Sequence, residues 1–265
     1  MTTENKRLND FIEKGAEIGG SVAGAAIGLA ILGPVGVIGG AAFSPIITSV
    51  FKKIGTDISA KILSPREEAR IGATYTLALD KIDTEIKNGK EIRNDNFFSP
   101  QGGDRSSADM ILEGTLLKAR NEYEEKKIKF YSNFLANLNF DASISFEKGN
   151  TLLKIIEKMS YRQIILLGYI EDVNILLTEN WLVQFTQNEE LGHYHDFFSE
   201  VMDLYNQQIL KQVGQFGMRI SSLELSGLGK TLCKLLNTNE IENEDKNIII
   251  DTIYNVNKIA ITIIH

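Results

Sequence analysis

Residues 18–51 read IGGSVAGAAIGLAILGPVGVIGGAAFSPIITSVF, a stretch of 34 residues without a charged side chain in a chain that is 24% charged. Fourteen of these residues are large and apolar, and fourteen more are Ala or Gly. A single helix of this length would extend about 50 Å, whereas the hydrocarbon core of a bilayer is about 30 Å thick. The stretch therefore predicts association with a membrane, but not as one straight span.

Gly33-Pro34 lies near the middle of the stretch and divides it into Ile18–Leu32 and Val35–Phe51. Proline removes a helix hydrogen bond and clashes with the preceding turn, so Pro34 predicts a break. Each half is at or below the minimum for a perpendicular span, which is about 17 residues. Two arrangements fit this division: a single kinked and tilted span, or a shallow helical hairpin that enters from one side.

Glycines recur every four residues within the stretch and therefore stack on one helix face. The interval begins with Gly15–Gly19 just before it, and the residues expected to pack closely are Gly20, Gly24, Gly28, Gly36 and Gly40, with Pro34 as the break. Such a column lets helix backbones approach each other in lipid. In a water-exposed helix each glycine would cost about 1 kcal/mol relative to alanine. The pattern favours a self-packing, pore-forming glycine zipper; a buried Ala/Gly-rich core hairpin of a soluble protein is the alternative.

Composition restricts the remaining classes of function. The net charge of −7 and the pI near 5.2 argue against nonspecific nucleic-acid binding, which requires a basic surface. The single cysteine excludes an internal disulfide and suits a reducing compartment. Lys52, Lys53, Lys61 and Arg66 follow the uncharged stretch closely. The positive-inside tendency therefore predicts an inner-membrane protein whose large C-terminal part is cytoplasmic.

After an amphipathic N-terminal piece and the uncharged stretch, which together occupy residues 1–63, a helical body is expected over 64–150. Ser64-Pro65-Arg66-Glu67 predicts a capped helix start, and the helix continues to about Asn88. A loop follows over Lys90–Arg105. The next helix, capped by Ser106 or Ser107, extends to about Leu138, with a solvated surface or a break at the charged run Glu122–Lys129.

Several apolar segments downstream carry a family resemblance. They are Phe134–Leu138, Phe146, Leu152–Ser160, and Gln163, Ile164, Leu166, Leu167 and Ile170. This pattern resembles the bacterial Abi-alpha (abortive infection) family over about Glu113–Leu235. Members pair a Gly/Ala-rich N-terminal region with a helical body. The resemblance implies a role in phage defence, in which an infected cell stops growing or dies before phage matures.

Residues 151–240 are expected to form a small domain that resembles a winged helix, followed by a helical tail over 241–265. Ser160 predicts a helix start, Ser222–Ser226 alternates as a strand does, and Gly227 opens a last helix through Leu236. The stretch at the position of a recognition helix, His195–Gln208, carries acidic residues and no Lys or Arg. Because phosphate would be repelled, this domain is expected to contact proteins.

The candidate catalytic and metal-binding motifs are all weak. Gly227-Leu228-Gly229-Lys230-Thr231 ends like a phosphate-binding loop, but the earlier glycine is replaced by Glu224. His193 and His195, beside Glu189, Glu190 and Asp196, match no zinc spacing. Cys233 and Trp181, with Leu182 and Phe185, are expected in the core. We therefore expect no enzyme, no metal and no cofactor.

The sequence thus predicts a mainly α-helical, non-enzymatic bacterial membrane effector of anti-phage defence. It is expected to form homo-oligomers, contact membrane lipid, respond to a phage or host protein, and permeabilise the inner membrane. The alternative is a soluble oligomeric module that sequesters a partner and uses the uncharged stretch as an inter-subunit core.

Overall fold

The computed structural model describes residues 10, 12–15, 45–100, 102–177, 192–213 and 222–264, with the side chains of the last helix as far as Ile259. These residues are mainly helical and include one small antiparallel sheet. The chain divides into two compact units, residues 1–158 and 159–265. None of the helices in the described ranges is long and apolar enough to cross a bilayer.

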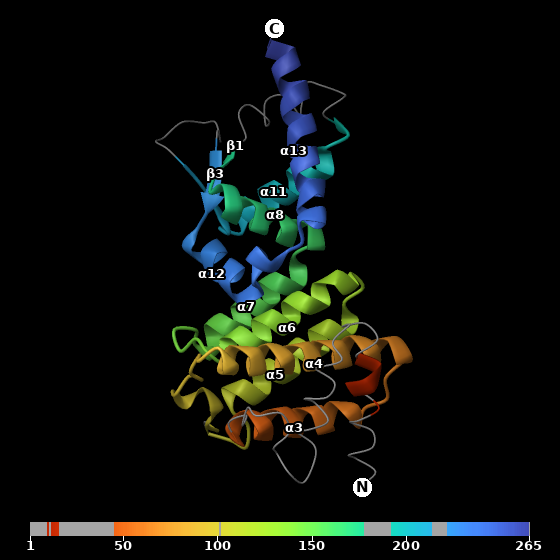
Figure 1. Ribbon diagram of the computed structural model, residues 1–265, viewed down its shortest axis with the longest axis vertical. Coiled ribbons are helices and arrows are strands. Elements are labelled where there is room, and N and C mark those ends of the chain that lie inside the picture. Colours follow the sequence, from red (N-terminus) through yellow and green to blue (C-terminus); the bar gives the residue numbers. More distant parts are fainter. Residues whose placement is uncertain are drawn as a thin grey trace. The chain divides into compact units, whose positions relative to one another are not determined.

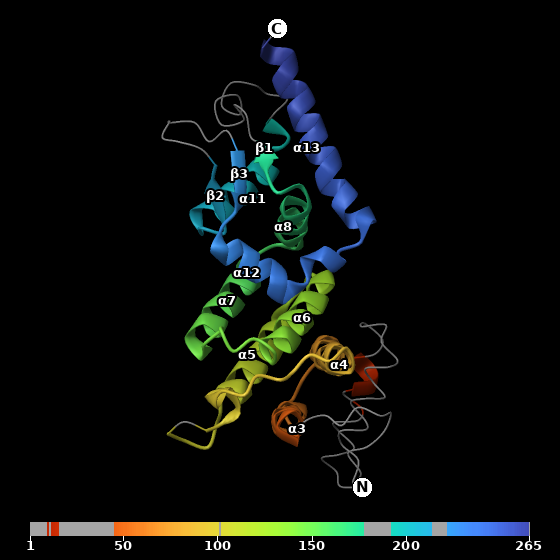
Figure 2. The same ribbon diagram turned by 60° about the vertical axis from the view of Figure 1, so that its left-hand side comes forward.

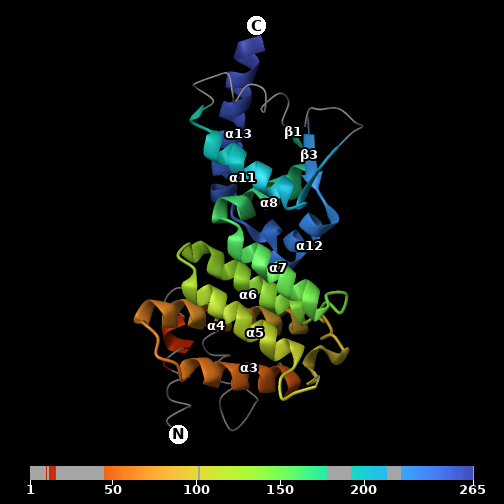
Figure 3. The same ribbon diagram turned by 180° about the vertical axis from the view of Figure 1, so that it is seen from behind.

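The first unit is built from five α-helices within its described ranges. They are α3 (Pro45–Ser59), α4 (Pro65–Lys87), α5 (Ser107–Asn121), α6 (Ile128–Leu138) and α7 (Phe146–Lys158), with short 3-10 turns η1 (Asn96–Phe98) and η2 (Glu125–Lys127). Figure 1 shows α4 across α5 and α6, and Figure 2 views α3 and α4 nearly end-on. α5 lies between α3 on one side and α7 on the other (Figure 3). This arrangement makes α4, α5 and α6 the centre of the unit.

The predicted helix starts are confirmed. Ser64 caps α4 and Ser106 caps α5, each in a capping box in which the third helical residue, Glu67 or Asp109, accepts from the backbone of the cap. α4 ends at Asn88, and Gly89 follows with φ +85°. Glycine reaches this left-handed conformation without the Cβ clash of other residues, so the predicted stop is also confirmed.

The loop after α4 is held by two buried side chains. Phe97 is buried, as expected, and the Arg93 guanidinium lies against its ring at 4.1 Å. Arg93 donates hydrogen bonds to the carbonyl oxygens of Leu138 and Ile144, at 3.2 and 3.0 Å. These carbonyls follow the end of α6, so Arg93 satisfies acceptors that the helix leaves unpaired.

The charged run between α5 and α6 differs in part from the expectation. The helix does break there, at Glu122, but the run is not a uniformly solvated surface. Glu122 and Lys127 are buried and form an ion pair at 2.6 Å, and the Tyr131 hydroxyl donates to Glu122 at 3.2 Å. Lys127 also donates to the carbonyl oxygen of Glu157 at 3.3 Å. A buried charge requires such partners, and the break in the helix brings them together.

The second unit packs around α8 (Tyr161–Val173), which contacts α11 (His195–Asn206), α12 (Gly227–Leu236), η3 (Thr238–Glu240) and α13 (Asn243–Ile264). Its sheet has the order β1 (Leu176–Leu177), β3 (Ser222–Leu225) and β2 (Leu210–Gln212), with both pairs antiparallel. The predicted strand at 222–226 and the helices that begin after Ser160 and Ser226 are confirmed. The tail is helical, as expected.

Candidate functional site

The residues that the sequence assigned to helix packing in the membrane are Gly20, Gly24, Gly28, Pro34, Gly36 and Gly40, and all lie outside the described residues. The structure does describe the chain on both sides of them, at residues 12–15 and from Pro45 onward. These two flanking segments, which we call the N-terminal anchor (residues 12–15) and α3, determine how the uncharged stretch joins the first unit.

The N-terminal anchor packs against α4 with its backbone in close approach. A Cβ atom built on Gly15 would lie 2.1 Å from the carbonyl carbon of Gly72 and 2.4 Å from the nitrogen of Ala73. Ile12 is fully buried, and the Lys14 ammonium pairs with the Glu68 carboxylate. Because any side chain at position 15 would collide with backbone atoms, only glycine allows this contact. The first glycine of the repeating interval therefore packs on protein.

α3 is the second anchor, and it buries a complete apolar face. Its buried residues with large side chains are Ile47, Val50, Phe51, Ile54 and Ile58. Phe51 meets the Tyr75 ring of α4 edge-to-face, with centroids 5.2 Å apart, and the Tyr75 hydroxyl donates to the Phe51 carbonyl oxygen at 3.0 Å. Fully burying each such side chain stabilises the packed helix by about 1.5–3 kcal/mol.

One lysine adds a polar contact between α3 and α5. The Lys53 ammonium lies 3.1 Å from the Asp109 carboxylate and donates to the Asp104 carbonyl oxygen at 2.9 Å. Asp109 is buried and also serves in the capping box of α5, so Lys53 neutralises a carboxylate that is largely removed from water. The neighbouring Lys52 is exposed and has no ion-pair partner among the described residues.

The position of α3 corrects the C-terminal limit of the predicted membrane segment. The sequence placed Pro45–Phe51 within that segment, but these seven residues form the first half of α3 and bury Ile47, Val50 and Phe51 in the first unit. Residues 18–44 remain, which is 27 uncharged residues. The correction follows from packing, because an apolar helix face can be covered by protein as well as by lipid.

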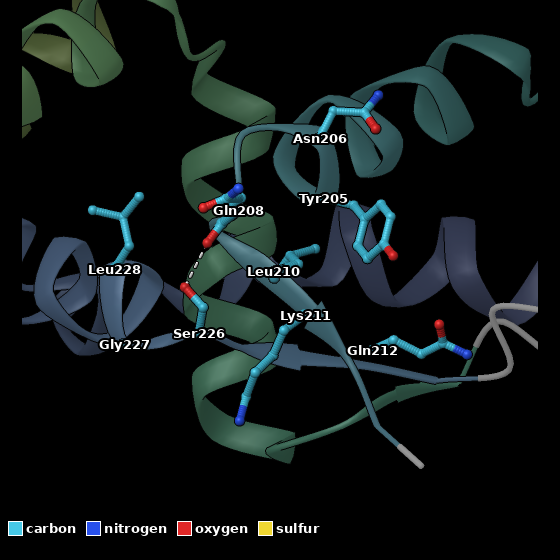
Figure 4. Close-up of a pocket in the computed structure, with 9 residues that line it drawn as sticks. All are labelled: Tyr205, Asn206, Gln208, Leu210, Lys211, Gln212, Ser226, Gly227 and Leu228. Atoms are coloured by element: carbon cyan, nitrogen blue, oxygen red, sulfur yellow. Dashed lines mark hydrogen bonds between the residues drawn. The ribbon is translucent and has the colours of Figure 1, made fainter. Parts of the chain in front are cut away.

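The second unit contains an open groove of about 660 Å³ (Figure 4). It lies between the C-terminal end of α11, strand β2 and the start of α12, and Tyr205, Leu210 and Lys211 are among its lining residues. The only charged lining residue is Lys211, which pairs with Glu224 at 2.6 Å. The groove therefore presents no free charge with which to select a ligand.

The phosphate-loop-like motif beside this groove is a helix start that packs on a strand. The Ser226 hydroxyl accepts from the Gly229 nitrogen at 3.1 Å and donates to the Gln208 carbonyl oxygen at 2.6 Å (Figure 4). A Cβ on Gly229 would lie 2.4 Å from the Ile209 carbonyl oxygen, whereas one on Gly227 would meet nothing within 4 Å. Gly229 is thus required for close packing, and the motif does not cradle a phosphate.

The other candidate residues remain dispersed or lie outside the described ranges. His193 is exposed and His195 begins α11, while Glu189, Glu190, Trp181, Leu182 and Phe185 lie outside those ranges. Within the described part of the chain, no three His, Cys, Asp or Glu side chains gather as metal ligands would. Cys233 is buried, as expected, and its burial raises the pKa of the thiol to about 12. A neutral, buried thiol is a poor nucleophile.

The residues that carry the family resemblance are mostly core residues. Phe134 and Leu138 in α6, and Leu152 and Ile156 in α7, are all buried, as is the apolar face of α8 around Leu167. Ser160 caps α8. The resemblance is therefore one of packing and helix starts, and it bears on the fold more directly than on chemistry.

Comparison with known proteins adds no family. No protein-family model, no curated protein and no solved structure matches this chain.

Proposed function

We propose that this protein is a non-enzymatic bacterial effector of anti-phage defence that acts on the inner membrane through its uncharged, glycine-rich stretch. In this proposal the chain forms homo-oligomers, its two units remain cytoplasmic, and the stretch perturbs or permeabilises the bilayer when a phage or host protein triggers it. The abortive-infection role is supported by the resemblance described above, and the membrane role by the following observation.

Both segments that flank the uncharged stretch are docked on the same unit. Gly15 packs on Gly72 of α4, and α3 begins at Pro45 and buries its apolar face on α4 and α5. The first unit has charged side chains over its exterior and therefore belongs in water. A stretch that leaves and rejoins this unit must enter and leave a bilayer at the same surface.

This constraint selects between the two arrangements that the sequence left open. A single complete span would place its ends on opposite sides of the membrane, and two complete spans would need about 34 residues. Only 27 uncharged residues lie between Ile18 and Ser44. With both anchors docked, a shallow hairpin that enters from the cytoplasmic surface is the arrangement that fits. Its glycines would then let hairpins of neighbouring copies pack closely.

The second unit supplies a surface for a protein trigger. The order of its elements, with a helix before β1, α11 before β2, and the sheet order β1-β3-β2, supports the expected winged-helix-like arrangement. α11 stands at the recognition-helix position and carries Asp196, Glu200 and Asp203 without Lys or Arg. Glu200 is occupied by Arg162 and the Ser160 hydroxyl. The remaining acidic surface suits a basic protein segment better than a nucleic acid.

One observation favours the alternative, a soluble oligomeric module that sequesters a partner. The last seven residues of the uncharged stretch are packed inside protein, with Phe51 only 1% exposed. If residues 18–44 also pack on protein, the stretch forms an inter-subunit core and the chain has no membrane role.

Cell fractionation separates the two proposals. The full chain, a deletion of residues 18–44 and a Gly24→Leu variant are expressed in bacteria, and membranes are washed with alkaline carbonate. The membrane effector predicts that the full chain resists the wash and depolarises cells, that the deletion is soluble and harmless, and that Gly24→Leu stays in the membrane without depolarising it. A full chain that is released by carbonate and leaves the membrane potential unchanged would support the soluble module instead.

A further inference from the structure

The first half of α3 is covered by protein although its sequence continues the uncharged stretch without a break. Val35–Ser44 contains ten uncharged residues after Pro34, and Pro45–Phe51 extends this run to 17. A perpendicular membrane crossing needs about 17 apolar residues, whereas segments of about 10–14 are re-entrant or buried. The docking of α3 therefore removes from the second half the seven residues that a full crossing requires.

We propose that α3 is a restraint with two alternative partners, the core of the first unit and the lipid bilayer, and that its release converts a shallow membrane hairpin into a complete crossing. This inference rests on the proposed membrane function and adds its regulation. The apolar side chains Ile47, Val50 and Phe51 are buried in the docked state by α4 and α5, and they enter the hydrocarbon core in the released state.

The charges around α3 match both states. In the docked state Lys53 neutralises the buried carboxylate of Asp109 at 3.1 Å. In the released state, Lys52 and Lys53 follow Phe51 directly and stand where a crossing that ends at Phe51 returns to the cytoplasmic headgroups. Lysines are enriched at that position in membrane proteins. The same two residues thus end the helix span in lipid, while one of them ties the helix to protein.

The contacts that hold α3 are few and are confined to one face. Besides the apolar residues, the printed polar contacts are the Tyr75 hydroxyl on the Phe51 carbonyl oxygen and the Lys53 contacts with Asp109 and Asp104. Its outer face, which includes Pro45, Ile46 and Ser49, is exposed, with Ile46 51% exposed. A helix at the edge of a unit opens more readily than a central one.

Charge reversal at two adjacent lysines tests the restraint. Lys53→Glu places a carboxylate beside Asp109 and weakens docking, whereas Lys52→Glu makes the same change in net charge where no described residue pairs with the lysine. Ile58→Asn, at a fully buried position outside the uncharged stretch, weakens docking without a change in charge. The full chain and these variants are added to phosphatidylglycerol/phosphatidylethanolamine vesicles that contain a fluorescent dye.

Hydrogen exchange of residues 45–59 and dye release are measured on the same samples. We expect Lys53→Glu and Ile58→Asn to speed both exchange and release roughly fivefold or more, and Lys52→Glu to match the wild type. The restraint is overturned if release does not follow the exchange of α3 across the variants, including release that rises in Lys52→Glu as much as in Lys53→Glu. If neither the wild type nor a loosened variant binds the vesicles, the proposed membrane function itself fails.

Discussion

The Tyr75 hydroxyl donates a hydrogen bond to the Phe51 carbonyl oxygen across 3.0 Å, in a site where both side chains are buried. Tyr75 belongs to α4, in the centre of the first unit, and Phe51 is the last residue of the uncharged run. This contact marks the point at which a sequence suited to lipid is held by protein.

Tyr75→Phe removes this hydrogen bond and leaves the ring in place. We expect the free energy of unfolding of the first unit to fall by about 1 kcal/mol, the usual net value of an intramolecular hydrogen bond. Tyr254→Phe is the matched control, because Tyr254 is 65% exposed and its loss should change little. Denaturant titration followed by hydrogen exchange of α4 measures the difference; equal stability in both variants would contradict it.

Alkaline pH should weaken the same contact. Burial raises the pKa of Tyr75 far above its usual value, so the folded state keeps the phenol protonated after the unfolded chain has ionised. A raised folded pKa contributes stability that is complete below the unfolded pKa, about 10, and is lost as the pH rises toward the folded pKa. The stability difference between wild type and Tyr75→Phe should therefore shrink as the pH increases beyond about 10. A difference that stays constant from pH 8 to pH 11, to take a practical range of about three pH units, would argue against this coupling.

Gly229→Ala should destabilise the second unit by about 1–3 kcal/mol, because the added Cβ overpacks the start of α12 against β2. Its nearest contact would be the Ile209 carbonyl oxygen at 2.4 Å, a backbone atom that moves only with its strand. Gly227→Ala, two residues away in the same helix, meets nothing within 4 Å and should be close to neutral. Thermal unfolding followed by circular dichroism compares the two variants. The packing explanation fails if Gly227→Ala is the more damaging change.

Lys127→Met should destabilise the first unit by about 3–5 kcal/mol, because the Glu122 carboxylate would remain buried without its counter-ion. The two side chains are 2% and 6% exposed, so water does not replace the lost partner. Adding Glu122→Gln to Lys127→Met removes the unpaired charge and should recover part of the loss. Urea unfolding of both single variants and the double variant gives the coupling between them. Additive effects would show that the ion pair is not the source of the penalty.

Local signals in the sequence determined the starts of the helices. Ser64, Ser106, Ser160 and Ser226 each cap a helix where the sequence placed one, because a cap depends on residues within three positions along the chain. The same holds for the stop at Gly89, the alternating strand after Ser222 and the absence of charge over residues 18–51.

The sequence by itself did not determine which apolar and charged residues find partners far away in the chain. Nothing near Phe51 indicates that Tyr75 will cover it, and the Gly15–Gly72 and Gly229–Ile209 approaches join positions that are distant in sequence. The charged run after Asn121 likewise gives no sign that Glu122 and Lys127 are buried together. Hydrophobicity is a property of one segment, whereas burial is decided by the surface that packs against it. The sequence therefore determined that residues 18–51 avoid water, and only the tertiary structure decided that Pro45–Phe51 avoid it inside protein.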